Sequence, residues 1–132
     1  MVRSLEAMIL LDTHVAVWLA AGEISRLSES ALTAIEEAST VALSPITLLE
    51  VAYLVEAKRL TSEAAFVIHA LTAGAGFDVD DQPLARVVAN ALGATWTRDP
   101  FDRLLVGHAS LTGAGLVTKD PTIRDHYPAA IW

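Results

Sequence analysis

The chain has 132 residues, 53% of them hydrophobic, and a formal net charge of −7. This length predicts a single domain, residues 1–132, that buries roughly two-thirds of the surface its unfolded chain exposes. The charge argues against a broad basic face of the kind that grips nucleic acid. Because the chain has no cysteine, disulfides, thiolate zinc sites and a cysteine nucleophile are excluded, and we expect a cytoplasmic protein.

The N-terminal half predicts two strands and four helices. Residues 1–7 look like a leader to the first strand, with Met8 as an alternative start, and they do not match a secretory signal peptide. The unbroken apolar run 8–11 predicts a strand buried on both faces of a parallel sheet. Helices are expected over 13–20, 28–38, 45–58 and 61–71, with a second strand over 40–43.

The C-terminal half continues the alternation. Glycines at 74 and 76 break the chain before a strand over 77–79, and helices are expected over 83–92 and 100–113. A fourth strand is expected over 116–118, and 131–132 could add a fifth. This pattern predicts an α/β sandwich: a mostly parallel sheet of four to five strands with helices on both faces, and no membrane-spanning helix.

Four carboxylates stand where predicted strands or helices end or begin. They are Asp12, Glu50, Asp102 and Asp120, with Asp99 close to the third. Open α/β sheets place their sites at the carboxyl ends of the strands, so we expect these side chains to converge. Carboxylates that converge repel one another, and the usual remedy is a hard divalent cation with oxygen ligands. The pattern therefore indicates a metal-dependent phosphodiester site.

Each acidic residue also has an ordinary structural explanation. Asp12 suits the N-cap of the first helix, Asp99 and Asp102 suit a variant capping box, and Asp120 suits a turn. Glu50, in a helix that is apolar on nearly all sides, either shares a narrow solvent stripe with Thr47 or points into a polar cavity. It is the joint pattern that favours a shared site.

The remaining polar residues carry weaker signals. We interpret Asp80 and Asp81 as a solvated turn, and the four histidines lack the helical spacing of zinc sites. No Gly-x-Ser-x-Gly elbow or phosphate-binding glycine motif is present. The C-terminal third groups several basic residues beside the acidic positions, so any RNA contact should be local: Arg98, Arg103, Lys119 and Arg124.

Four segments resemble the PIN-domain ribonucleases, most of all the VapC-type toxins of bacterial toxin–antitoxin pairs. They are LDTHVAVW (11–18), SPITLLEVA (44–52), RDPFDRLL (98–105) and LVTKD (116–120). The likeness spans residue 8 to about 127, and the third segment is the most specific. The resemblance implies a PIN-like three-layer sandwich and an endoribonuclease that uses Mg²⁺ or Mn²⁺.

The resemblance also implies roles for individual residues. The catalytic and metal-binding quartet would be Asp12, Glu50, Asp102 and Asp120, and Asp99 would bind metal through water. The substrate side of the site would comprise Thr13, His14, Arg98, Arg103, Thr118 and Lys119, with the two threonines orienting the carboxylates. The family further implies a homodimer and a VapB-like antitoxin whose tail blocks the site.

Two other functions stay open at this point. A receiver-type phosphoacceptor domain has a similar length and a lysine near its last strand, as Lys119 is here, but it needs an acidic pair where Asp12 is followed by Thr13. A non-catalytic member of the fold would bind another protein through its apolar surface.

Overall fold

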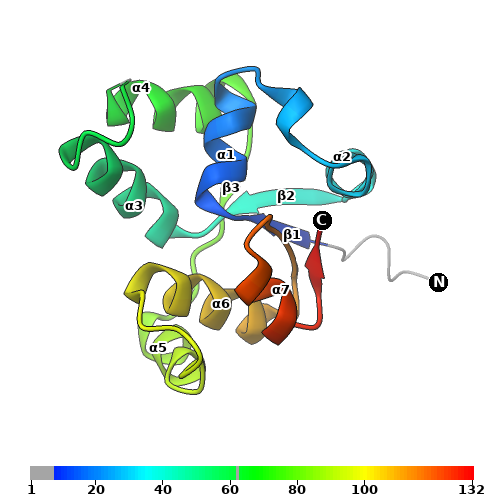
Figure 1. The fold of residues 1–132 in the computed structure, drawn as a ribbon, viewed down its shortest axis with the longest axis vertical. Coiled ribbons are helices and arrows are strands. Elements are labelled where there is room, and N and C mark those ends of the chain that lie inside the picture. Colours follow the sequence, from blue (N-terminus) through cyan, green and yellow to red (C-terminus); the bar gives the residue numbers. More distant parts are fainter. Residues whose placement is uncertain (1–7, 62) are drawn as a thin grey trace.

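The computed structural model describes residues 8–61 and 63–132, which form one parallel sheet with helices on both sides (Figure 1). The strands are β1 (Met8–Leu11), β2 (Thr40–Leu43), β3 (Asp78–Val79), β4 (Gly115–Val117) and β5 (Ala130–Ile131). Their order is β3-β2-β1-β4-β5, and every neighbouring pair is parallel. The predicted sheet is confirmed, with β1 at its centre; the expected leader, residues 1–7, lies outside the described residues.

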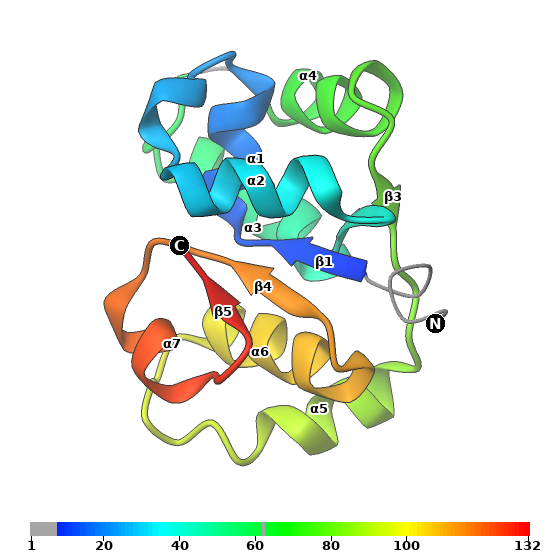
Figure 2. The same cartoon turned by 90° about the vertical axis from the view of Figure 1, so that its right-hand side faces the viewer.

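In the part of the chain that the structure describes, seven α-helices complete the three layers. They are α1 (Thr13–Ala20), α2 (Glu29–Glu37), α3 (Pro45–Glu56), α4 (Ala64–His69), α5 (Leu84–Ala91), α6 (Pro100–Thr112) and α7 (Pro121–His126). Helices α1 to α4 cover one face of the sheet and α5 to α7 the other (Figure 2). Helix α3 also contacts α6, so the two helical layers meet beside the sheet. None of the described helices has the length and apolar character that crossing a bilayer needs.

Capping side chains explain where most of these helices begin. The carboxylates of Asp12, Asp99 and Asp120 and the hydroxyls of Ser28 and Ser44 accept hydrogen bonds from the first-turn amides of α1, α6, α7, α2 and α3. The sequence predicts four of the five starts. It misses α7 because Asp120-Pro121 also suits a turn, although an Asp-Pro pair opens α6 as well.

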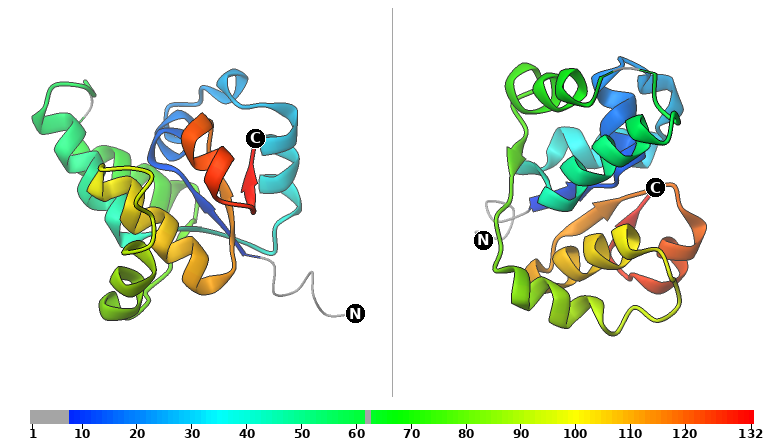
Figure 3. Two further views of the ribbon diagram at one scale, coloured as in Figure 1. Left: turned by 60° about the horizontal axis from the view of Figure 1, so that its bottom comes forward. Right: turned by 90° about the vertical axis from the view of Figure 1, so that its left-hand side faces the viewer.

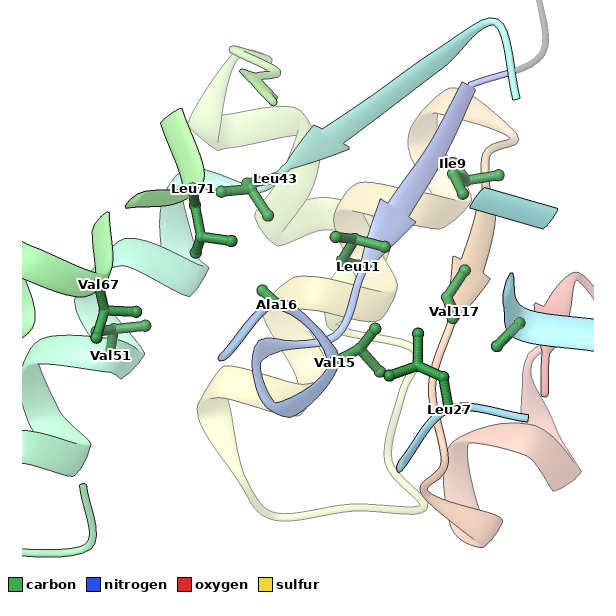
Figure 4. Close-up of a cluster of buried hydrophobic side chains, with 11 residues drawn as sticks. Ile9, Leu11, Val15, Ala16, Leu27, Leu43, Val51, Val67, Leu71 and Val117 are labelled. Carbon is green, nitrogen blue, oxygen red and sulfur yellow. The ribbon is translucent and has the colours of Figure 1, made fainter. Parts of the chain in front are cut away.

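Two hydrophobic cores flank the sheet. Along β1, Ile9 and Leu11 pack with Val15 of α1 in the cluster shown in Figure 4, and Leu10 packs with Leu105 of α6 on the opposite face. Both faces of β1 are therefore buried, as its apolar run predicts.

The remaining differences from the predicted elements are small. Helix α3 ends at Glu56, before the left-handed Lys58 (φ 59°), and α4 begins at Ala64. A 3₁₀ turn, η2 (Ile24–Arg26), and a π-helical turn, η3 (Ala70–Gly74), were not predicted. Short turns of this kind lack the periodicity by which longer helices are recognised in sequence.

Helices α5 and α6 approach closely at Gly107. A Cβ atom placed there would lie 2.7 Å from the Val87 carbonyl oxygen and 3.0 Å from the Ala91 Cβ. The right-hand view in Figure 3 shows α5 beside α6. This contact fixes the segment of α6 that follows its acidic first turn.

A buried histidine ties three segments together. His108 of α6 lies with its Nδ1 2.9 Å from the Ser44 hydroxyl and its Nε2 2.8 Å from an Asp80 carboxylate oxygen. A carboxylate can only accept, so Nε2 donates to Asp80 and, in the neutral ring, Nδ1 accepts from Ser44. The interpretation of Asp80 as solvated is wrong: it is partly buried and also accepts from Gln82. Asp81 is exposed, as expected.

We predict that His108→Leu destabilises the protein by about 1–3 kcal/mol, because it leaves the Ser44 hydroxyl and the Asp80 carboxylate without their shared partner. His108→Gln, which keeps a donor and an acceptor, should retain more of the stability. Urea unfolding of the two variants measures the difference. Equal stability of His108→Leu and the wild type would show that this contact contributes nothing.

Candidate active site

Asp12 is the most deeply buried carboxylate of the site. It follows β1 directly and is buried, with 9% of its surface exposed. One carboxylate oxygen accepts from the Thr13 amide (2.7 Å) and the other from the Thr118 hydroxyl (2.6 Å). Because Thr118 follows the neighbouring strand β4, the two adjacent strand ends together fix the direction of this side chain.

Glu50 is brought to the same place by α3. The helix buries Thr47, Val51 and Leu54, and Glu50 stands half-buried between this face and the exposed one. The Thr13 hydroxyl donates to its carboxylate at 2.6 Å. Thr47 is fully buried, so the two residues share no solvent stripe, and the alternative in which Glu50 points into a polar cavity is correct.

The other acidic residues come from the starts of α6 and α7. Asp99 caps α6 by accepting from the amides of Phe101 (2.8 Å) and Asp102 (3.3 Å). Asp120 caps α7 in the same way, and its own amide donates to the Thr118 hydroxyl (3.1 Å). The structural explanation of Asp99 as a cap is therefore correct, whereas Asp120 is a helix cap and not the turn residue that the sequence suggests. Neither role conflicts with a place in the site.

A cavity of about 460 Å³ collects these side chains. Its walls include all five acidic residues that the sequence singles out, together with six others: Asp12, His14, Glu50, Tyr53, Leu54, Arg59, Asp99, Pro100, Phe101, Asp102 and Asp120. Among the described residues, no three acidic or histidine side chains are already close enough together to enclose a cation. The carboxylates therefore line one cavity but are not arranged as a complete set of metal ligands.

Burial and repulsion between charges make Asp12, Glu50 and Asp102 hard to ionise. Burial raises the pKa of Asp12 and of Glu50 above their usual ranges. Burial, followed by repulsion from Asp99 and the other three, raises the pKa of Asp102 to about 7. A site whose carboxylates resist ionisation in this way favours bound protons or a bound cation.

The predicted substrate residues are not all placed alike. His14 lines the cavity, whereas Thr13 and Thr118 use their hydroxyls to hold Glu50 and Asp12. Arg103 points elsewhere and donates to the Ala91 and Leu92 carbonyls at the end of α5. Arg98 and Lys119 are exposed, and neither belongs to the described lining of the cavity.

Five lining residues are not among the predicted site residues: Tyr53, Leu54, Arg59, Pro100 and Phe101. Tyr53 lies three residues after Glu50 on the same helix, a spacing that places two side chains side by side. Phe101 lies between the two acidic residues that open α6. Both spacings were available as signals. Arg59 follows the end of α3, and no pattern in the sequence indicates its position.

The sequence is similar to known proteins. The sequence pattern of the PIN domain matches residues 9–127. Ribonuclease VapC22 of Mycobacterium tuberculosis is 35% identical over 134 residues, which cover 94% of this chain and 98% of that protein.

The fold is also similar to solved structures. VapBC2 from Rickettsia felis, bound to a DNA fragment from its promoter, matches with a TM-score of 0.64 at 19% identity, over 93% of this chain and 95% of that one. DNA-bound VapBC from Salmonella typhimurium matches with a TM-score of 0.54 at 21% identity, over 94% and 95%. At these identities the likeness concerns the fold alone.

The family match contradicts the receiver-type alternative, whose acidic pair after the first strand is also absent here, since Asp12 is followed by Thr13 and His14. A pattern match over most of the chain and a relative of 35% identity place this protein in the PIN-domain family, among the VapC-type ribonucleases.

Proposed function

We propose that this protein is an endoribonuclease dependent on Mg²⁺ or Mn²⁺ and that it is the toxin of a VapBC-type toxin–antitoxin pair. The supporting observation is that five carboxylates line one cavity and that three of them have a raised pKa. Hard oxygen donors in this number suit Mg²⁺, which binds through carboxylates and retained waters. The residues present therefore fit the metal that the family implies.

Each acidic residue has a role in this proposal. The metal would be held by Asp12, Glu50, Asp102 and Asp120, and by Asp99 through water. When bound, the metal neutralises charge at the scissile phosphate and lowers the pKa of a water. Thr118 and the Thr13 amide keep Asp12 oriented, and the Thr13 hydroxyl keeps Glu50 facing the cavity. Glu50 is our candidate to accept the proton of the attacking water.

Contacts to the substrate backbone would come from the rim. We assign flanking phosphates to Arg98 and Lys119, which are exposed beside Asp99 and Asp120, with His14 inside the cavity. Arg103 would have to break its hydrogen bonds to two carbonyl oxygens before it could contact a phosphate.

Two different surfaces support the proposed partners. A VapB-like antitoxin with a basic segment would be attracted by the acidic cavity, and the similar solved structures named above are VapBC complexes. A homodimer is supported by a stripe of exposed apolar side chains along α5 and its C-cap: Leu84, Val88 and Leu92. RNA cleavage by such a toxin would take place in the cytoplasm.

We predict that Asp102→Asn lowers metal-dependent RNA cleavage by roughly 100-fold or more. A residue that binds the metal should matter more than the outer groups whose loss costs about 10–100-fold. The measurement is cleavage of a mixed, structured RNA pool by the antitoxin-free protein in Mg²⁺, Mn²⁺ or EDTA.

The matched control is Asp125→Asn, an exposed acid of α7 outside the cavity, which should cleave like the wild type. Cleavage that persists in EDTA or in Asp102→Asn would contradict the metal site. A folded wild type that is inactive in every metal would instead favour the non-catalytic alternative.

We also predict that the metal-free protein loses stability as the pH rises from about 4 to about 7. The pKa of Asp102 is raised to about 7 in the folded chain from an ordinary value of 3.8, so folding takes up a proton in this window and stability falls as that proton leaves. Asp102→Asn removes this titration. Its melting temperature relative to the wild type should therefore be higher at pH 8 than at pH 5.

Thermal unfolding in EDTA at the two pH values tests this dependence, with Asp125→Asn as control. Added Mg²⁺ should raise the wild-type melting temperature at pH 8 more than at pH 5, because metal binding requires ionised carboxylates. A pH-independent difference between Asp102→Asn and the wild type would show that Asp102 ionises normally.

A further inference from the structure

Two aromatic rings form one wall of the acidic cavity. Tyr53 of α3 and Phe101 of α6 both line it, with ring centroids 5.4 Å apart and planes tilted by 39°. Tyr53 is 47% exposed, whereas Phe101 is largely covered. Phe101 therefore supports one side of Tyr53 and leaves much of the tyrosine accessible beside the carboxylates.

The fold does not require these rings for its core. Neither ring belongs to the two buried clusters that flank the sheet. A single exposed aromatic residue is common on protein surfaces and carries no meaning alone. Here the two rings are paired, and they share a cavity with the residues proposed to cleave RNA.

Charge alone cannot hold RNA at this site. The protein has a net charge of −7, and five carboxylates line the cavity. Arg59 is the single arginine or lysine among its described lining residues. A polyanion is repelled by such a surface except where a cation is bound, so part of its affinity has to come from contacts that do not depend on charge. Stacking of bases on aromatic rings is the contact of that kind that single-stranded nucleic acid offers.

We propose that Tyr53, supported by Phe101, is a stacking subsite for an unpaired base next to the scissile phosphate, with Arg59 contacting a neighbouring phosphate. The proposal rests on the ribonuclease function proposed above and adds the residues that would position its substrate. Bases within a continuous duplex have both faces covered by their neighbours. A base in a loop, a bulge or a single strand can leave its stack and reach the ring of Tyr53.

A protein partner is the competing occupant of this wall. Leu49 lies one helical turn before Tyr53 and is 59% exposed, so the apolar surface continues along α3. The position of Tyr53 inside the cavity favours RNA, since Leu49 does not line it.

The test compares two substitutions of the full chain. Tyr53→Phe keeps the ring, and Tyr53→Leu keeps apolar bulk without it. The probe is a fluorescein-labelled 12-nucleotide single-stranded RNA of mixed sequence. Its binding is measured by fluorescence anisotropy in a buffer that contains Ca²⁺. The same RNA annealed to its complement and an abasic 12-mer serve as controls. Thermal unfolding checks that both variants fold like the wild type.

We expect Tyr53→Leu to weaken binding of the single-stranded RNA by about 10-fold and Tyr53→Phe to leave it within about 2-fold of the wild type. The duplex and the abasic strand should bind weakly and equally to all three proteins. Arg59→Gln should weaken binding of every probe, including the abasic one, because it removes a phosphate contact.

Wild-type affinity in Tyr53→Leu, or no preference of the wild type for the strand that carries bases, would overturn the stacking subsite. Loss of self-association in Tyr53→Leu, with RNA binding unchanged, would assign the surface to a protein partner instead. Cleavage in Mg²⁺ separates this proposal from the proposed function. If the wild type cleaves RNA and Tyr53→Leu cleaves it equally well, only the proposed subsite is contradicted. If the wild type does not cleave RNA, the proposed nuclease function is contradicted.

Discussion

The hydroxyls of Thr13 and Thr118 hold two carboxylates in positions that their burial and charge oppose. Thr118 fixes Asp12 across the β1–β4 pair, and Thr13 fixes Glu50 across to α3. Burial raises the pKa of each acid, and these hydrogen bonds oppose the rise without cancelling it, so the net effect of the surroundings is to disfavour ionisation of both groups. The proposed metal chemistry depends on this balance.

Much of the fold follows from local patterns. The apolar run 8–11 predicts a doubly covered central strand, and Ser44-Pro45 and Asp99-Pro100 predict the starts of α3 and α6. Because parallel strands end at one edge of a sheet, the same patterns place the predicted carboxylates around one cavity. The roles of these residues in metal binding and catalysis stay predictions, which the proposed substitutions test.

Long-range packing sets the limit of sequence analysis. Arg103 has a sequence neighbourhood suited to phosphate contact, yet it binds carbonyls at the end of α5. Asp80 resembles a turn residue, but it accepts from His108, 28 positions away. The Tyr53–Phe101 pair forms only where α3 and α6 meet. Each of these contacts depends on how the two helical layers pack, which no local spacing encodes.

The strand order has a consequence for the making of the protein. Asp12 receives its second hydrogen bond from a residue 106 positions later, and Asp120 also comes near the end of the chain. A chain emerging from the ribosome exposes its N-terminal part first. Until β4 and α7 have been synthesised, the cavity lacks one wall and Asp12 lacks its Thr118 partner. The five carboxylates that line the cavity are therefore brought together only after the C-terminal part of the chain has been made.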